Sequence, residues 1–383
     1  MKVLVTPRDR NPYQTDLYET MAAIDPRVEV AYLDGPTQSQ TANLLALPAL
    51  LATWRARGYR VLHLHWVYEF QLPWAHGHPW VTRLTRAWFG VFLATAKVLG
   101  YRIVWTAHNV LPHDAVFDDD TAARRELVRA CDAVIAHSTH TAEVLERFGA
   151  SAVEVVPQGA DGAVRSRQPT RIAARAQLEL RDEDVVVLFF GKVLPYKGVE
   201  MLLEAAAVLR PDTPIVVLVA GECRDPAYRQ VLEALVDQAG PRVRANFEFV
   251  PDARLETLLA AADFAAFPFR TVTNSSSVVL ALAAGVPVIV PELPELEDLP
   301  AGATVRHRRG TSALVETLER VAYMDPEDRA AMTAAATRFA PSRSWAAAAT
   351  ATRGVYARLL AGGPTSARRG QGSPRHRREL VSR

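Results

Sequence analysis

The sequence predicts an α/β protein built from two doubly wound parallel-sheet domains. At 383 residues the chain is too long for one compact core, so two domains of ordinary size are expected. Short apolar runs alternate with helical patterns in both halves, which is typical of parallel sheets covered by helices. Polar or basic segments follow several of these runs, at the strand end where open α/β sheets bind ligands.

The N-terminal half, residues 1–167, is expected to form the first domain. Its expected strands are Lys2–Thr6, Val28–Leu33, Val61–His65, Tyr101–Thr106, Ala133–His137 and Val153–Val156. Its expected helices are Leu17–Ile24, Leu44–Arg57, Thr121–Ala130 and Thr141–Phe148. The segment Trp88–Leu99 is apolar but short and follows Arg83 and Arg86, so a buried or interfacial helix is expected there rather than a membrane span.

The second domain is expected over residues 168–342, after a linker at Gln168–Arg171. Its expected strands are Val185–Phe190, Pro214–Ala220, Val243–Phe249, Phe264–Phe267 and Val288–Val290. Its expected helices are Val199–Leu209, Tyr228–Ala239, Leu255–Ala261 and Val278–Ala284. A further helix is expected over residues 343–360.

Composition narrows the class of protein. A net charge of +2 gives no indication of nucleic-acid binding. Residues 361–383 are rich in Arg, Gly, Ser and Pro and are expected to be a basic disordered tail, which either contacts anionic lipids weakly or has no role. Cys131 and Cys223 lie far apart and outside any CxxC pair, so a reducing cytoplasm is expected. The first residues lack the apolar length of a signal peptide.

A basic loop follows the apolar run Val185–Phe190. Gly191 ends the strand, and Lys192 and Lys197 lie before the next helix. Together with the free N–H groups of that helix, the two lysines would form a pocket for a diphosphate. The alternative is that both are solvated loop charges.

A run of hydroxyl and amide side chains precedes the small-residue helix at Val278. The run consists of Thr273, Asn274, Ser275, Ser276 and Ser277. Five such side chains exceed what helix capping needs, so a phosphate-binding role is favoured over an ordinary N-cap.

Histidines and aromatic residues gather at strand ends in the N-terminal half. His108 follows a strand directly, where a neutral imidazole could hydrogen-bond a sugar or move a proton. Rings near His65 suit stacking on a sugar, although His63 and His65 could equally be satisfied core residues. No carboxylate or cysteine pattern accompanies the HxH pairs, so no metal site is expected. The expected acceptor-binding residues are Tyr13, Gln14, His65, Trp66, Tyr68, Glu69 and Asn109.

The order of these motifs resembles that of the GT-B glycosyltransferases, most closely the retaining family 4 that uses nucleotide sugars. GKVLPYKG resembles the family's phosphate loop, and TAHN resembles the segment with a donor-facing histidine. VVPQGAD and FVPDARLETLLAAADFAAFPF resemble the turn between the domains and the helix and strand that lead into the donor site. The resemblance covers residues 61–291 and implies two Rossmann-like domains facing a cleft, with the last helix crossing back to the first domain.

The resemblance also shows a departure. The family usually carries a pair of glutamates around the donor helix, and Val272 and Leu280 stand at these positions here. Asn274, Ser275 and Ser276 are the expected replacements. Glu295, with its neighbours Glu292 and Glu297, is a candidate ribose ligand or an ordinary loop charge. The departure leaves the retaining or inverting outcome open.

The resemblance implies a hexosyltransferase-type enzyme of polysaccharide biosynthesis that moves a sugar from a nucleotide diphosphate sugar to a glycan, lipid-linked or small-molecule acceptor. Expected catalytic residues are His108, Lys192 and Lys197; expected donor-binding residues are Gly159, Gly191, Glu222, Asn274, Ser275, Ser276, Ser277 and Glu295. No metal or cofactor is expected, because Asp118–Asp120 lie in a helix lead-in and no DxD motif stands in a suitable loop. The expected location is the cytoplasm, with peripheral contact at the inner face of the membrane. The alternatives are a catalytically silent GT-B subunit and a sugar-nucleotide epimerase.

Overall fold

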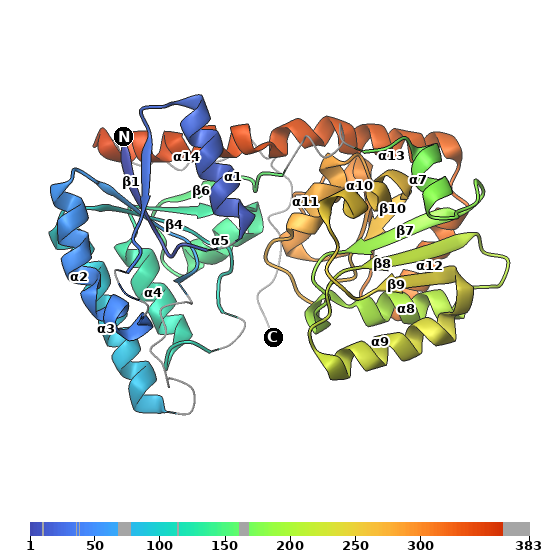
Figure 1. Cartoon of the computed structure of the whole chain (residues 1–383), viewed down its shortest axis with the longest axis horizontal. Helices are drawn as coiled ribbons and strands as arrows, with labels where there is room; N and C mark the ends of the chain where they lie inside the picture. Colours follow the sequence, from blue (N-terminus) through green and yellow to red (C-terminus); the bar gives the residue numbers. More distant parts are fainter. Residues whose placement is uncertain are drawn as a thin grey trace, which may run out of the picture.

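The computed structural model describes residues 1–9, 11–35, 37, 39–67, 78–112, 115–160 and 168–362. They form two six-stranded parallel sheets with helices on both faces, side by side in one molecule (Figure 1). The predicted fold class of two doubly wound domains is therefore confirmed.

The N-terminal sheet has the strand order β2-β1-β3-β4-β5-β6. Its strands are β1 (Lys2–Thr6), β2 (Glu29–Tyr32), β3 (Val61–Leu64), β4 (Arg102–Thr106), β5 (Ala133–Ala136) and β6 (Val153–Val155). The helices are α1 (Pro12–Ile24), α2 (Gln40–Ala56), α3 (Pro79–Val98), α4 (Asp120–Ala130) and α5 (Thr139–Arg147). Most of these helices begin earlier than the apolar pattern predicts, because N-cap side chains such as Asn11 and Ser39 accept a backbone N–H ahead of it.

The C-terminal sheet has the strand order β12-β11-β10-β7-β8-β9. Its strands are β7 (Val185–Phe190), β8 (Ile215–Ala220), β9 (Val243–Asn246), β10 (Phe264–Ala266), β11 (Val288–Pro291) and β12 (Thr304–His307). The helices are α7 (Arg171–Gln177), α8 (Val199–Val208), α9 (Pro226–Ala239), α10 (Asp252–Ala261), α11 (Ser276–Ala283), α12 (Thr311–Ala322) and α13 (Pro326–Phe339). β7 and β8 pair in register from Val185 and Ile215 onward, and both are buried along their whole length.

Three expectations for this half were wrong or incomplete. Arg171 does not end a linker but begins α7, because the Thr170 side chain caps that helix by accepting the Ala173 N–H. The strand expected to reach Phe249 ends at Asn246. The elements β12, α12 and α13 were not predicted, although Leu314, Leu318 and Val321 of α12 follow helical spacing and are buried.

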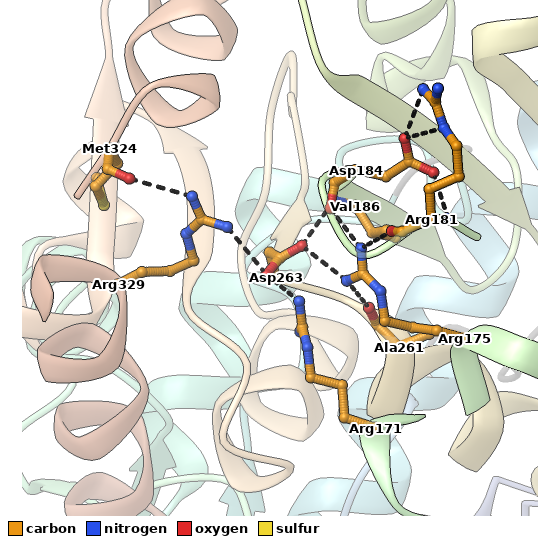
Figure 2. Close-up of polar contacts among 9 residues, drawn as sticks. All are labelled: Arg171, Arg175, Arg181, Asp184, Val186, Ala261, Asp263, Met324 and Arg329. Atoms are coloured by element: carbon orange, nitrogen blue, oxygen red, sulfur yellow. Dashed lines mark hydrogen bonds and ion pairs between the residues drawn. The ribbon is translucent and has the colours of Figure 1, made fainter. Parts of the chain in front are cut away.

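A buried carboxylate ties helices to the amino end of the C-terminal sheet. Asp263 precedes β10 and accepts hydrogen bonds from Arg171, Arg175 and Arg329 at 2.8, 3.4 and 3.4 Å, and from the Val186 N–H at 2.8 Å (Figure 2). The arginines come from α7 and α13, so one side chain anchors both helices to β7 and β10. This end of the sheet lies opposite the carboxyl ends of the strands.

The last helix of the described chain, α14 (Trp345–Leu360), packs against α1 of the N-terminal half. Arg353 pairs with Asp25 at 3.0 Å, and Arg358 pairs with Glu154 at 2.8 Å. α13 and α14 therefore run along one side of both halves (Figure 1). The domain boundaries drawn at residues 167 and 342 stay predictions, since residues 161–167 lie outside the described part.

None of the helices in the described ranges has the length and apolar character to span a membrane.

Candidate active site between the two sheets

A cavity of about 490 Å³ opens between the two halves of the molecule. This volume is in the range of sites that bind small molecules. Its lining comes from the start of α1, the turn after β6, the end of β7, and α10, α11 and α14: Asn11, Pro12, Tyr13, Asp16, Gln158, Gly159, Ala160, Phe190, Gly191, Asp252, Leu255, Glu256, Ser276, Ser277, Leu280 and Trp345. The cavity lies at the carboxyl end of β7, where doubly wound sheets bind their ligands.

Gly191 brings the lysine loop and the start of α11 together. Its φ is +106°, in the region that favours glycine. A Cβ at this position would lie 2.7 Å from Ser277 Oγ and 3.4 Å from Lys197 Nζ. The hydroxyl and the ammonium group thus converge on the same backbone position, and any larger residue would separate them.

Lys197 is the partly buried cation of this loop, and Lys192 is exposed. Burial, and then the neighbouring charge of Lys192, lower the pKa of Lys197 to about 8. An anion beside Lys197 would relieve both effects, since it favours the charged amine. Ser276 and Ser277 add the first N–H groups of α11, which attract negative charge.

Ser275 and Asn274 have structural contacts of their own. The Ser275 side chain is the N-cap of α11 and accepts the Val278 N–H at 3.3 Å. Asn274 donates its amide N–H to the backbone carbonyl of His108 at 2.9 Å and so joins the two halves. Of the predicted hydroxyl run, Ser276 and Ser277 face the 490 Å³ cavity, while Asn274 and Ser275 border a smaller one of about 40 Å³.

His108 is the end of a buried chain of hydrogen bonds. His65 Nδ1 lies 3.0 Å from His108 Nε2, and Tyr18 Oη lies 2.7 Å from His65 Nε2 and 2.9 Å from His63 Nδ1. His63 Nε2 continues to Thr106 Oγ1 at 2.8 Å. His63 and His65 are both buried and bonded in this way, which fits the alternative of core histidines. The acceptor-binding role of His65 stays a prediction.

Burial lowers the pKa of every histidine in this cluster. The pKa of His63 falls to about 3, and those of His65 and His108 fall well below the usual value. The imidazoles are therefore neutral near pH 7. His108 is further held by Trp66, which stacks on it at 4.2 Å between ring centroids, and by the edge of Tyr13 at 4.6 Å.

His137 lies next to this cluster and contributes a second polar feature. Its Nδ1 bonds the Val156 carbonyl at 2.8 Å, while Nε2 is buried without a hydrogen-bond partner in the described part of the chain. His137 borders the 40 Å³ cavity, which also contacts Gln158, Glu295 and Arg343. A cavity of this size holds about one water molecule.

The remaining predicted residues fall in different places. The Gln14 amide donates to the Pro7 carbonyl at 2.8 Å and accepts the Asp9 N–H at 3.0 Å, so it holds the loop between β1 and α1. Glu222 pairs with Arg224 at 2.9 Å, and its carbonyl accepts the Val193 N–H of the lysine loop. Gly159 allows Trp345 to approach, because a Cβ there would lie 2.4 Å from the indole.

Four further predicted residues remain, and two of them lie in the described part of the chain. Glu295 Oε1 lies 3.9 Å from His140 Nε2 at the border of the small cavity. Asn109 follows His108 and is half-buried. Tyr68 and Glu69 lie outside the described residues.

Several lining residues were missed from sequence. Asp252 and Glu256 are one helical turn apart in α10 and both face the cavity, as does Asp16 of α1. Their i, i+4 spacing is visible in the sequence, but only the fold shows that this face of α10 lines the same cavity as α11. Leu280 also lines the cavity. That it replaces a family glutamate stays a prediction.

The two facing sheets and the cleft at their carboxyl ends define the GT-B class of proteins. Comparison with known proteins gives the family. Residues 3–163 match the profile of Glycosyltransferase Family 4, and residues 170–299 match that of Glycosyl transferases group 1. The chain belongs to the group 1 glycosyltransferases with the GT-B fold, as the motif order predicted.

Curated relatives carry glycosyltransferase names. D-inositol 3-phosphate glycosyltransferase of Rhodococcus jostii is 29% identical over 75% of this chain and 64% of its own length. The protein of the same name from Jonesia denitrificans is 34% identical over 58% of this chain and 54% of its own length. GDP-mannose:glycolipid 4-beta-D-mannosyltransferase of Xanthomonas campestris is 26% identical over 73% of this chain and 70% of its own length. The chain thus spans less than two thirds of the first two relatives.

Solved structures share the fold. Sucrose-phosphate synthase from Thermosynechococcus elongatus superposes with a TM-score of 0.70 at 19% identity, over 94% of this chain and 99% of that one. Anabaena Alr3699/HepE in complex with UDP-glucose gives a TM-score of 0.66 at 18% identity, over 94% and 100%.

Proposed function

We propose that the chain transfers a sugar from a nucleotide diphosphate sugar to an acceptor held on the N-terminal side of the cleft. The observation that carries the proposal is the convergence of Lys197 Nζ, Ser277 Oγ and the Gly191 backbone beside a 490 Å³ cavity. Negative charge develops on the nucleotide diphosphate as it leaves. A preorganised cation and helix N–H groups stabilise that charge where it forms.

The donor lies across the cavity in this proposal. The diphosphate binds at Lys197, Lys192 and the start of α11, and the sugar extends toward the neutral His108. The nucleoside end meets Asp252 and Glu256, whose carboxylates accept hydrogen bonds from ribose hydroxyls in the way that acidic residues do in other doubly wound folds. A glutamate at position 280 would make this contact, but Leu280 cannot. Asp252 and Glu256 would make it instead.

No metal ion takes part in the proposed reaction, because the two lysines supply the positive charge that a divalent cation would otherwise bring. The acceptor is a glycan or lipid-linked molecule in polysaccharide biosynthesis, at the cytoplasmic face of the membrane. A relative named as a glycolipid mannosyltransferase supports this acceptor class.

The test combines a donor screen with a transfer assay. A panel of nucleotide sugars is first tested by thermal shift, and the stabilising donor is then assayed for sugar release. We expect Lys197→Ala to abolish stabilisation and release, with Lys2→Ala, a surface lysine paired to Glu29, as the control. Chelator should leave the rate unchanged, and loss of activity that magnesium or manganese restores would contradict the metal-free reaction. A wild type that binds nucleotide but never releases sugar would instead be a silent binding subunit.

A further inference from the structure

Helix α3 has two apolar faces, and only one of them is used in the fold. Phe89, Phe92 and Leu93 are buried against the N-terminal sheet and its neighbouring helices. The opposite face is also apolar, and it is exposed. Its members recur every three or four residues along the helix: Trp80, Leu84, Ala87, Val91, Ala94 and Val98. We call these six residues the α3 stripe.

The α3 stripe is unusual for a surface helix. Its larger side chains are strongly exposed: Trp80 by 64%, Leu84 by 55%, Val91 by 45% and Val98 by 87%. Alternating steps of three and four residues keep side chains on one line of a helix. A solvent-facing helix normally places charged residues on that line. A continuous exposed apolar surface of this kind marks an interaction site.

The exposed charges beside the α3 stripe are mainly cationic. α3 contains Arg83, Arg86 and Lys97 and no carboxylate, and the neighbouring α2 contains Arg55 and no carboxylate. The two helices lie together, and Trp88 donates its indole N–H to the Leu44 carbonyl at 2.8 Å. Asp118 pairs with Arg83 and Arg86 from beside α4, and Asp132 pairs with Lys97 at 2.8 Å. The two carboxylate side chains are only 17% and 15% exposed, whereas the Arg83 side chain is 75% exposed.

We propose that the α3 stripe lies in the surface of an anionic lipid bilayer, with the cationic side chains on either side contacting the headgroups. An exposed apolar face with Arg and Lys beside it is typical of helices that lie in this plane. The indole of Trp80 suits the boundary between headgroups and acyl chains. The sequence predicted a buried or interfacial helix at Trp88–Leu99. In this proposal the interfacial residues are those of the α3 stripe, on the exposed face of the same helix.

The same charges argue against a second copy of the chain as the occupant. A symmetric pairing through the α3 stripe would bring Arg83, Arg86 and Lys97 of one copy toward the same residues of the other. Neither α2 nor α3 has a carboxylate, and Asp118 and Asp132, which pair with these cations, are themselves mostly buried. The charge that would face the other copy is therefore mainly cationic, and like charges across an interface oppose association. A bilayer with anionic lipids offers both the apolar layer and the opposite charge.

The direction of α3 relates the membrane to the cleft. The chain enters α3 after the carboxyl end of β3 and leaves it before the amino end of β4, so α3 runs antiparallel to the strands. Trp80 is therefore on the side of the sheet where the strands have their carboxyl ends, and His65 and His108 lie at this end as well. A lipid-linked acceptor would reach the cleft from the carboxyl ends of the strands. This consequence rests on the proposed function, whereas membrane binding by the α3 stripe does not.

Vesicle flotation of the full chain tests the proposal. The probes are vesicles of phosphatidylcholine alone and of phosphatidylcholine mixed with phosphatidylglycerol. We expect binding to the mixed vesicles that weakens with salt, and at least about tenfold weaker binding by the double variant Leu84→Glu, Val91→Glu. The matched control is Ile172→Glu, Val208→Glu, which puts the same charges at exposed apolar positions of the other domain.

The readouts separate this proposal from the proposed function. Donor binding without vesicles should be unchanged in the α3 double variant, which also shows that the variant is folded. Absence of wild-type binding to both vesicles would overturn the proposal, as would equal binding by the double variant, which would assign binding to another segment such as the basic tail. A wild-type dimer in size-exclusion chromatography that the double variant abolishes would assign the α3 stripe to a second copy instead.

Discussion

Lys197 combines partial burial with a second lysine nearby, and this pair determines how its charge depends on pH. In the free protein its pKa is about 8, and a bound diphosphate raises it because the charged amine then has a counter-ion. Binding is therefore accompanied by proton uptake when the pH is near or above 8.

The prediction at Lys197 concerns affinity. Binding of the nucleoside diphosphate selected by the donor screen should be constant below pH 7.5 or so and weaken by up to about tenfold per pH unit above 8. Calorimetry in buffers of different ionisation enthalpy measures both the affinity and the proton uptake. Lys197→Arg, whose side chain stays charged, should remove the pH dependence. An affinity that is flat to pH 9.5 or so in the wild type would contradict the assignment.

Tyr18 serves two histidines with one hydroxyl. The Oη lies within 2.9 Å of His63 Nδ1 and 2.7 Å of His65 Nε2, and His65 in turn contacts His108. Because a hydroxyl has one proton, it donates to one imidazole and accepts from the other. The tautomers of His65 and His108 are thereby linked.

Tyr18→Phe should lower the free energy of unfolding by about 1–3 kcal/mol, since the buried Nε2 of His65 loses its partner. His63 Nδ1 keeps its contact with the Tyr356 hydroxyl. Denaturant unfolding measures the loss, with Tyr32→Phe as the control because that ring is only half-buried beside Tyr18. Nitrogen NMR of the histidines should also show a change in the tautomer populations of His65. Unaltered tautomers together with unaltered stability would show that the hydroxyl does not organise the cluster.

At the scale of elements, Asp263 is the point where α7, α13, β7 and β10 meet (Figure 2). Its side chain is almost fully buried, and Arg175 beside it is buried as well. Such a pair has a large desolvation cost, so its net contribution to the free energy of unfolding is small. Removing one partner costs more, because the other charge is left buried and unpaired.

Asp263→Asn should therefore destabilise the protein by about 3–5 kcal/mol, because Arg175 stays buried without a counter-ion. Glu183→Gln is the control: its pair with Arg181 is exposed on both sides and should contribute less than about 1 kcal/mol. Thermal and denaturant unfolding of both variants give the comparison. Equal stabilities would mean that solvent or another residue compensates the arginines.

Across the whole molecule, the buried histidines connect the two ends of the chain. His63 contacts Tyr356 of α14 at 2.5 Å, and Asn274 of the C-terminal half bonds the backbone of His108. Burial lowers the pKa of His63 to about 3 and that of His137 to about 4, so the folded protein keeps these groups neutral.

Acid should destabilise the fold through these groups. The unfolded chain takes up protons on histidine near pH 6.5 and the folded protein does not, so stability should fall as the pH decreases from about 6.5 toward 4. Denaturant midpoints measured between neutral pH and pH 4.5 or so test this. His137→Asn, which removes one titrating group, should reduce the slope. A stability independent of pH over this range would contradict the burial of neutral imidazoles.

Local sequence patterns were enough to predict many of the strands and helices of this protein. The strands β1, β7 and β8 were predicted from apolar runs, because a strand that is buried on both faces has a continuous apolar sequence whichever strands pair with it. The lysine loop and the start of α11 followed from residue types beside a strand end and a helix start. The buried residues Leu314, Leu318 and Val321 follow helical spacing, so α12 could have been predicted from the sequence as well.

The tertiary structure decided what depends on distant segments. Tyr18 and His63 are 45 residues apart, and His63 and Tyr356 are 293 residues apart. The sequence around each of them shows nothing of the shared hydrogen bonds. The carboxylates of α10 line the cleft because the fold places this helix and α11 around one cavity. Which apolar residues of α3 stay exposed depends on which side of that helix the fold buries. Local chemistry determines which element forms, but which side chains meet depends on how the elements pack, and that is a property of the whole chain.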